Sequence, residues 1–362
     1  MRVALDVTPL LGAPTGIGTF VRGASTGLVD AGQAVVGYGL TGRRRLGSSL
    51  PDGVQRGRAV PAAVALALWG RGSALIAAEW LAGPVDVVHG TNFVVPPARR
   101  AARVVTVHDL TAVRFPQMCA PASRRYPELV RRAAGEGAWV HTPSAFVAGE
   151  VIELLNVPAG QVRAVAHGVD HVVGMAGRPQ ARGRDVVALG TVEPRKDLPM
   201  LVRAFDRVAS GRADVRLVIA GAAGWGAQQL DDAIAAASHA ERIVRLGYVD
   251  DIRRAQLMTE AAVFAYPSRY EGFGLPPLEA MAAGVPVVAT DTGAVPEVVG
   301  DAALLVAVGD EDGLAAALSD VLDHPEVAAS LVARGKAQAA PYTWAACAAG
   351  LVALYEEAIA CK

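Results

Sequence analysis

Two carboxylates, Glu271 and Glu279, lie eight residues apart on either side of a glycine-rich turn. Pro276 and Pro277 follow the turn and suit the first turn of a helix, where a missing N–H group costs little. Gly284 suits the C-terminal end of the same helix, because glycine readily takes a left-handed conformation there. A helix start presents backbone N–H groups to an anion. The stretch therefore predicts a site that holds a phosphate at the helix start while a carboxylate accepts hydrogen bonds from a sugar diol.

A pair of cations, Arg195 and Lys196, lies between the apolar run Val186–Leu189 and the start of a predicted helix. Asp197 is expected to cap that helix, and Pro199 is expected in its first turn. Positive charge at a helix N-terminus opposes the helix dipole, so a bound anion explains the pair better than a plain surface position does. Open α/β sheets bind ligands at the carboxyl ends of their strands. The pair is therefore predicted to bind an anionic ligand.

Three more residues that could contact a ligand follow predicted strands. Gly16 and Gly18 come after Val3–Val7 in a run that suits close approach of a phosphate. The third glycine of the dinucleotide fingerprint is absent, and a plain tight turn fits equally well. His108 closes the run Val104–Val107, where a ligand contact and an ordinary structural role are both open.

The sequence predicts no metal site. The seven histidines lack metal-ligand spacing with a supporting carboxylate, and His89 and His141 fall inside strand patterns, where a structural role is expected. The three cysteines match no metal or disulfide pattern, which favours a reducing compartment. A Walker A loop and a nucleophile elbow are both absent.

The charge is small overall but unevenly distributed. A net charge of −1 argues against nucleic-acid binding. Residues 1–172 hold 17 Lys and Arg against 11 Asp and Glu, whereas residues 173–362 hold 17 against 24, so the halves carry +6 and −7. The first half is therefore expected to meet something anionic.

Four arginines of the first half, Arg124, Arg125, Arg131 and Arg132, are expected on one helix. They form either a solvated basic face or a contact with anionic lipid. No apolar run reaches the ~18 residues that span a bilayer. We therefore expect a cytoplasmic protein, with weak peripheral contact at the inner face of the membrane left open.

Short apolar runs alternate with helical patterns along the whole chain, which is typical of doubly wound parallel α/β sheets. The Gly-, Pro- and Arg-rich segment 174–183 marks a boundary between two Rossmann-like domains that face each other across a cleft. The domains are predicted at 1–173 and 174–343, with the last helix, 344–362, joining the first. Residues 37–58 are expected to form a surface loop. The predicted strands are 3–7, 85–89, 104–107, 139–142, 162–166, 186–189, 215–220, 243–246, 263–265, 287–289 and 303–306.

The order of motifs along the chain resembles that of family 4 retaining glycosyltransferases of the GT-B fold. The motifs are EPRKD, LGYV, YPSRYEGFGLPPLEAMAAGVPVVA and PEVVGDAALLV, preceded by TPL and TGIG near the N-terminus. The run from Tyr266 to Ala289 is the most specific of them, and the resemblance covers nearly the whole chain.

The resemblance implies roles for four catalytic residues. Arg195 and Lys196 match the pair that neutralises the donor diphosphate. Glu271 matches the carboxylate beside the donor sugar, and His108 matches a histidine beside that sugar.

The resemblance also implies a set of donor-binding residues. Glu279 matches the ribose-binding carboxylate. The others match the loop that meets the phosphates, the backbone around sugar and phosphate, and the nucleobase position: Gly16, Gly18, Phe273, Gly274, Leu275, Tyr248 and Val249. The family usually has asparagine where this chain has His167, which puts a site role for that residue in doubt.

The implied activity is transfer of a sugar, with retention, from a nucleoside-diphosphate sugar to a glycan or lipid-linked acceptor in polysaccharide or cell-envelope assembly. Mannose from GDP-mannose is the first choice, and a UDP-sugar is the second. No metal and no cofactor are implied. A nucleotide-sugar epimerase of the same fold stays open. A phosphorylase would need a pyridoxal phosphate lysine, and none of the three lysines lies in such a motif; a non-catalytic relic would lack Arg195, Lys196 or Glu271.

Overall fold

The computed structural model describes the chain except residues 13–14, 42–45, 47–49, 70–72, 74 and 173–182. The described residues form two compact units. The first comprises Met1–Gly168 and Tyr342–Lys362, and the second comprises Val169–Pro341. The boundary predicted between residues 173 and 174 lies outside the described residues.

The first unit is a seven-stranded parallel sheet in the order β3-β2-β1-β4-β5-β6-β7. Its strands are β1 (Arg2–Asp6), β2 (Ala34–Leu40), β3 (Gln55–Val60), β4 (Val87–Gly90), β5 (Ala102–Thr106), β6 (Trp139–Thr142) and β7 (Val162–Ala164). Its helices are η1 (Thr8–Leu10), α1 (Gly16–Asp30), α2 (Ala62–Trp69), α3 (Ala78–Ala82), α4 (Thr111–Arg114), η3 (Pro116–Met118), η4 (Pro121–Arg125), α5 (Tyr126–Gly135), α6 (Ala145–Leu155), η5 (Ala159–Gln161) and α15 (Trp344–Ala360).

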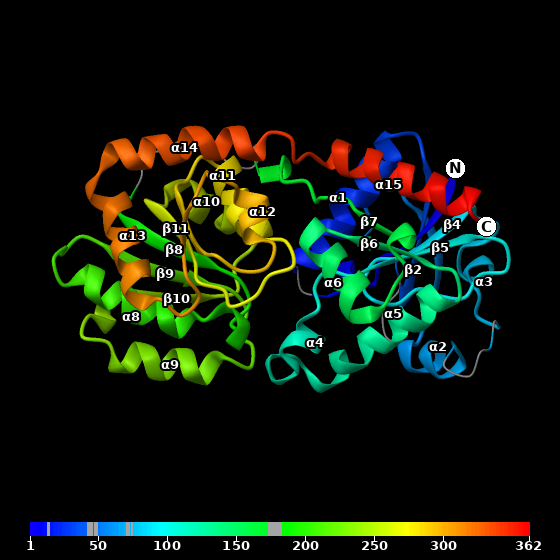
Figure 1. Ribbon diagram of the computed structural model, residues 1–362, viewed down its shortest axis with the longest axis horizontal. Coiled ribbons are helices and arrows are strands. Elements are labelled where there is room, and N and C mark those ends of the chain that lie inside the picture. The colour runs from blue at the N-terminus through cyan, green and yellow to red at the C-terminus, as the bar shows by residue number, and fades with distance from the viewer. Residues whose placement is uncertain (13–14, 42–45, 47–49, 70–72, 74, 173–182) are drawn as a thin grey trace. The chain divides into compact units, whose positions relative to one another are not determined.

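Two apolar layers cover the first sheet. Side chains of α1 and α15 pack on one face, and side chains of α2, α3, α5 and α6 pack on the other. Burial of both faces explains why the inner strands β1, β4, β5 and β6 read as mainly apolar runs. The C-terminal helix α15 lies along α1 (Figure 1). A Cβ added at Gly23 of α1 would lie 2.1 Å from the Trp344 ring, so glycine is what permits this close packing.

The second unit is a six-stranded parallel sheet in the order β10-β9-β8-β11-β12-β13. Its strands are β8 (Asp185–Leu189), β9 (Arg216–Ala220), β10 (Ile243–Gly247), β11 (Val263–Tyr266), β12 (Val287–Thr290) and β13 (Leu304–Val306). Its helices are η6 (Pro194–Lys196), α8 (Leu198–Ala209), α9 (Ala227–Ala236), η7 (Ala240–Arg242), α10 (Asp251–Glu260), α11 (Leu275–Ala282), α12 (Val295–Val299), α13 (Glu311–Asp323) and α14 (Pro325–Ala339). Side chains of α8 and α13 pack on one face of this sheet, and α11 lies on the other side (Figure 1).

The strand order reverses between β8 and β11, since β9 and β10 extend the sheet in one direction and β12 and β13 in the other. Doubly wound sheets bind ligands at such a reversal, outside the carboxyl ends of the strands. The loops that follow β8 and β11 carry Arg195, Lys196 and Glu271. The topology therefore brings the predicted cations and carboxylate to one place.

Two strands of the first unit were not predicted, and the surface loop expected at residues 37–58 is wrong at both ends. β2 and β3 occupy those ends, and their glycines serve close packing rather than turns. A Cβ at Gly57 would lie 2.8 Å from the carbonyl oxygens of Gly37 and Leu81, and a Cβ at Gly39 would lie 2.7 Å from Leu46. Glycine in a strand marks such close approach of the backbone.

Candidate functional site

The strongest cluster of the second unit joins Arg195 and Lys196 through one carboxylate. Lys196 Nζ lies 2.7 Å from Glu271 Oε1, and Arg195 Nη1 lies 2.6 Å from Glu271 Oε2. Glu193 adds a longer contact, 3.5 Å from Arg195 Nη2. The Lys196 and Glu271 side chains are only 12% and 8% exposed, so these charges interact in a partly dry environment. The structure thus brings three of the four predicted catalytic residues together.

The protonation states of this cluster follow from its contacts. Burial alone would raise the pKa of Glu271, but Arg195 and Lys196 outweigh burial and lower it to about 2. Burial lowers the pKa of Lys196, and Glu271 offsets part of that shift. The cluster therefore holds an ionised carboxylate between two cations.

Tyr266, which the sequence analysis did not single out, also contacts Lys196. The hydroxyl of Tyr266, at the end of β11, lies 2.8 Å from Lys196 Nζ, and the ammonium also lies 4.5 Å from the centroid of the Tyr266 ring. Burial raises the pKa of Tyr266 far above its usual range, so the hydroxyl stays protonated. The sequence contained evidence for this role, because Tyr266 ends a strand and is the first residue of the most specific motif. Tyr266 fixes the position of the lysine.

The glycine turn leads into α11 as predicted. Phe273 and Leu275 are buried, and Gly274 takes φ 98°, a left-handed conformation that a residue with a Cβ would adopt only with strain. Gly284, two residues beyond the last residue of α11, also has positive φ. Arg195 Nη1 donates to the carbonyl oxygen of Tyr270 at 3.1 Å, which ties the cation loop to this turn.

Asp197 occupies the N-cap position of α8 as predicted, with Pro199 in the first turn, but its side chain does not cap the helix. Asp197 has φ 43° and ψ 40°, a left-handed conformation, and its side chain makes no capping hydrogen bond to α8. Its carboxylate instead accepts a hydrogen bond from Arg269 Nε at 2.7 Å. Because Arg269 lies two residues before Glu271, this contact fixes the loop after β8 to the loop after β11.

Glu279, on α11, is fully buried and is held by two partners that the sequence did not reveal. Arg254 of α10 forms an ion pair with it, and His171 Nε2 lies 3.2 Å from its Oε1. Burial alone would raise the pKa of Glu279, but Arg254 and His171 outweigh burial and lower it. Glu279 is therefore a buried anion whose position is set from two sides.

Tyr248 and Val249 follow β10, and Tyr248 is 52% exposed. An exposed aromatic ring of this kind offers a face on which a base can stack. The next residue, Asp250, caps α10 by accepting a hydrogen bond from Arg253 N at 2.8 Å. Because α10 also carries Arg254, the predicted nucleobase position and the predicted ribose carboxylate are linked through one helix.

In the first unit, Gly16 and Gly18 are not a plain tight turn but the first residues of α1. Thr15 caps the helix by accepting a hydrogen bond from Gly18 N at 3.1 Å. A Cβ at Gly18 would lie 3.2 Å from the carbonyl oxygen of Pro9, so the helix start packs closely on the preceding loop.

His108 follows β5 and is held by the carbonyl oxygen of Thr91, 2.8 Å from its Nε2. A carbonyl only accepts, so Nε2 carries the proton and Nδ1 is the acceptor nitrogen. Burial lowers the pKa of His108, which keeps the ring neutral. His108 can therefore accept a hydrogen bond from a hydroxyl group but offers no positive charge to a phosphate.

His89 and His141 belong to a buried hydrogen-bonded chain. His141 Nε2 lies 3.0 Å from the Val165 carbonyl oxygen, and its Nδ1 lies 2.9 Å from Thr106 Oγ1. Thr106 Oγ1 also lies 2.7 Å from His89 Nε2, and His89 Nδ1 lies 2.7 Å from the Tyr355 hydroxyl. Because the Val165 carbonyl can only accept, His141 donates to it, and each following hydrogen bond is then donated toward the Val165 end. These hydrogen bonds connect β4, β5 and β6 to α15. This is the structural role that the sequence predicted for the two histidines.

We expect acid to destabilise the first unit through these imidazoles. Burial lowers the pKa of His141 from 6.5 to about 4, and it also lowers the pKa of His89 and of His167 well below 6.5. The unfolded chain therefore takes up protons first, and stability that is full above pH 6.5 is lost toward pH 4, by roughly 3 kcal/mol for His141. Asp6 has the opposite pH dependence. Burial raises its pKa to about 6, so the stability that its protonated carboxyl contributes is lost as the pH rises through 6.

As the pH falls, the stability regained through Asp6 offsets about the stability lost through one of the three histidines. The other two histidines therefore make the net effect of acid destabilising. The melting temperature is expected to fall between pH 7 and pH 5, and to fall less in a His141→Asn variant. A melting temperature that stays constant or rises over this interval would contradict the assignment.

The four arginines Arg124, Arg125, Arg131 and Arg132 do not share one helix. The first two lie on η4, and α5 begins at Tyr126 with Pro127 in its first turn. Arg131 and Arg132 pair with Glu128 and Glu136. These pairs favour the solvated-face alternative for the group as a whole.

The described part of the chain has no group of three or more His, Cys, Asp and Glu side chains placed to hold a metal ion. None of its helices is both long and apolar enough to span a membrane.

Comparison with known proteins identifies the class of protein to which these two units belong. Residues 14–173 match the profile of Glycosyltransferase Family 4, and residues 183–324 match that of Glycosyl transferases group 1. The O-antigen chain mannosyltransferase B of Escherichia coli is 32% identical over 286 residues, which are 75% of this chain and 74% of that protein. The chain belongs to glycosyltransferase family 4.

Another relative and two solved structures extend the comparison. The MMP alpha-(1->4)-mannosyltransferase of Mycolicibacterium hassiacum is 32% identical over 77% of this chain and 72% of its own length. Sucrose-phosphate synthase from Thermosynechococcus elongatus matches with a TM-score of 0.75 at 19% identity over the full length of both chains. WaaG, a glycosyltransferase involved in lipopolysaccharide biosynthesis, matches with a TM-score of 0.67 at 17% identity over 99% of this chain and 98% of its own. The structures confirm the predicted fold, and nothing in the comparisons supports the epimerase alternative.

Proposed function

We propose that this enzyme transfers mannose from GDP-mannose, with retention of configuration, to a glycan or lipid-linked acceptor in polysaccharide or cell-envelope assembly. The names of the two relatives above support mannose as the transferred sugar. The observation that carries the proposal is the cluster of Arg195, Lys196 and Glu271 at the strand reversal. The proposed location is the cytoplasm, with loose contact at the inner face of the membrane.

The cluster supplies what departure of a diphosphate requires. Negative charge grows on the β-phosphate as the bond to the sugar breaks, and preorganised donors aimed at that charge stabilise the transition state. Arg195 and Lys196 are such donors, because Glu271, Tyr270 and Tyr266 hold them in place. When the diphosphate takes over the two cations, Glu271 becomes free to accept hydrogen bonds from the sugar. In the retaining mechanism proposed here, the leaving phosphate receives the acceptor proton on the same face.

The other predicted residues have supporting roles in this proposal. Glu279 accepts hydrogen bonds from the ribose, and Tyr248 and Val249 contact the nucleobase. The backbone at Phe273, Gly274 and Leu275 surrounds the sugar and phosphate. Gly16 and Gly18 meet the phosphates from the first unit, and the acceptor nitrogen of His108 receives a hydrogen bond from a sugar hydroxyl.

A thermal-shift screen against GDP-mannose, UDP-glucose and ADP-glucose tests the donor. A ligand that binds only the folded state stabilises it by about 2.7 kcal/mol at a concentration of 100 Kd. GDP-mannose is expected to raise the melting temperature progressively with concentration, and the other two are expected to raise it far less. A larger shift with UDP-glucose would assign the donor to the UDP-sugars instead.

We also propose that transfer needs no metal ion, since two cations already face the position of the diphosphate. The screen and a transfer assay are therefore run with and without excess chelator. Both the shift and the turnover are expected to persist with chelator present. Loss of turnover that Mg²⁺ or Mn²⁺ restores would refute the proposal.

A further inference from the structure

The loop after β9 carries the most exposed of the five tryptophans of the chain. Trp225 is 52% exposed, whereas Trp139 and Trp344 are buried and Trp80 is 43% exposed. An aromatic ring that stays exposed on a loop held by a rigid scaffold is typical of a binding site. The surroundings of Trp225 show what this ring is placed to bind.

The backbone on both sides of Trp225 packs against the loop that carries the two cations. Gly226 N donates to the Val192 carbonyl oxygen at 3.1 Å. A Cβ at Gly224 would lie 2.5 Å from that same oxygen, and a Cβ at Gly226 would lie 3.0 Å from the carbonyl carbon of Glu193. The two glycines therefore permit direct backbone contact, and the indole is held beside the loop that carries the cation pair.

The start of the loop after β9 is held on two sides as well. Gly221 N donates to the carbonyl oxygen of Gly247, the residue before Tyr248, at 2.8 Å. A Cβ at Gly221 would lie 1.8 Å from the carbonyl oxygen of Gly190, so this loop also contacts the end of β8 closely. The position of Trp225 is therefore set by the neighbouring strand ends.

Glu193, which the backbone at Gly226 contacts, carries a partly exposed carboxylate. In the part of the chain that the structure describes, its Oε2 lies 3.5 Å from Arg195 Nη2, and its Oε1 has no hydrogen-bond partner. An aromatic ring near a carboxylate suits a sugar: the C–H groups of a pyranose pack on the flat ring, and its hydroxyl groups donate to the carboxylate oxygen. The loop pair therefore offers both kinds of contact that a sugar ring needs.

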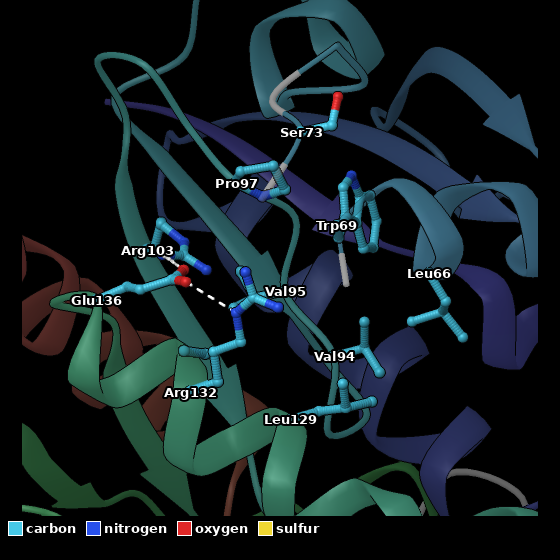
Figure 2. Close-up of a pocket in the computed structure, with 11 residues that line it drawn as sticks. Leu66, Trp69, Ser73, Val94, Val95, Pro97, Arg103, Leu129, Arg132 and Glu136 are labelled. Carbon is cyan, nitrogen blue, oxygen red and sulfur yellow. Dashed lines mark hydrogen bonds and ion pairs between the residues drawn. The ribbon is translucent and has the colours of Figure 1, made fainter. Parts of the chain in front are cut away.

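The pocket of the first unit lacks this combination, although a tryptophan and a carboxylate also line it. The pocket has a volume of about 220 Å³, and Trp69 and Glu136 are among its walls. Both carboxylate oxygens of Glu136 are engaged, one by Arg103 at 3.2 Å and the other by Arg132 at 2.9 Å (Figure 2). The indole N–H of Trp69 donates to a backbone carbonyl oxygen at 3.0 Å. A sugar in that pocket would find no free carboxylate oxygen.

We propose that the acceptor of the reaction is a sugar ring that stacks on Trp225 and donates a hydrogen bond from one hydroxyl group to Glu193. The acceptor class is thus a pyranose of a glycan rather than an open-chain alcohol, and this assignment rests on the function proposed above. Another hydroxyl oxygen of the ring forms the new bond to the anomeric carbon as the bond to the nucleoside diphosphate breaks, and its proton passes to the leaving phosphate. The residues assigned to the donor leave Trp225 unused, and Glu193 lies only two residues before Arg195.

The test measures transfer to the methyl α-pyranosides of mannose, glucose, galactose and rhamnose, with glycerol as the open-chain alcohol. The donor is the nucleotide sugar that raises the melting temperature most in the screen described above, so the test does not depend on GDP-mannose. Transfer to at least one pyranoside, and none to glycerol, is expected. Trp225→Ala is expected to raise the KM for that pyranoside by about tenfold or more, as removal of an aromatic stacking surface does, with kcat within about threefold. Trp225→Phe keeps a flat ring and is expected to restore the KM to within about threefold of the wild-type value.

A matched control and a donor measurement separate this role from a structural one. Trp80→Ala removes a tryptophan that is also exposed, on α3 of the first unit, and is expected to leave the KM unchanged. The melting shift that the donor causes is expected to be the same in Trp225→Ala as in the wild type, which shows that the variant folds and binds the donor.

Three results would overturn the acceptor assignment while the donor shift stays normal. They are an unchanged KM in Trp225→Ala, a raised KM that Trp225→Phe does not restore, and transfer to glycerol as readily as to the pyranosides. A wild-type protein that binds the donor but transfers to none of the four pyranosides would overturn it too. A wild-type melting temperature that no nucleotide sugar raises would instead refute the function proposed above, and this inference with it.

Discussion

Replacing Lys196 with alanine is expected to lower kcat by about 10²–10³-fold, the range for removal of one donor aimed at a developing oxyanion. Lys196 Nζ has three partners in the described structure: Glu271 Oε1, the Tyr266 hydroxyl and the face of the Tyr266 ring. These contacts hold the ammonium in place before the donor arrives. The loss therefore falls on the bond-breaking step, and initial rates of mannose transfer measure it.

Lys336→Ala is the matched control, because the chain has only three lysines and Lys336 is exposed on α14. It is expected to keep normal turnover. The Lys196→Ala variant leaves Glu271 paired with Arg195, so the fold is expected to survive and its melting curve checks this. Near-normal turnover in a folded Lys196→Ala protein would remove the basic pair from the proposed mechanism.

The sequence predicted the second unit more completely than the first, for a physical reason. Its four central strands, β9, β8, β11 and β12, are short apolar runs that are buried almost throughout, so their pattern is visible without knowledge of the helices that pack on them. β2 and β3 differ: glycines break the apolar run of β2, and β3 is an edge strand of sequence QRGRAV that is largely exposed. Their strand character depends on the backbones they pack against, and local sequence carries no record of that.

The candidate site divides in the same way. Strand ends are readable from the sequence, and the strand order then brings Arg195, Lys196 and Glu271 together. The partners of buried charges are not readable, because they come from distant positions. Arg254 lies 25 residues before Glu279, and Arg269 lies 72 residues after Asp197. Asp197 shows the consequence: its residue type suited a helix cap, but a tertiary ion pair determined its role.

The second large effect is expected from the different roles proposed for Glu279 and Glu271. Glu279→Gln keeps the side-chain shape but removes the charge, and is expected to weaken GDP binding by about 10- to 100-fold. This range corresponds to the loss of a hydrogen bond to a charged group, about 1.5–3 kcal/mol. Glu271→Gln is expected to leave GDP binding within a few fold and to lower kcat instead. Calorimetry with GDP and initial transfer rates, measured on both variants, compare the two carboxylates directly.

Buried charge makes a stability control necessary in this comparison. Glu279 pairs with Arg254 and lies close to His171, so Glu279→Gln leaves the partly buried guanidinium of Arg254 without its counter-charge. Breaking a fully buried pair costs about 3–5 kcal/mol of stability, which is an upper limit for this pair and makes lost stability an alternative cause of weaker binding. Arg254→Gln breaks the same pair from the other side while keeping the carboxylate. If Glu279 binds the ribose, Arg254→Gln should lose stability but keep more GDP affinity than Glu279→Gln. Equal affinities in the two variants, or unchanged affinity in a folded Glu279→Gln protein, would make Glu279 a structural anion and leave nucleoside recognition to the loop at Tyr248.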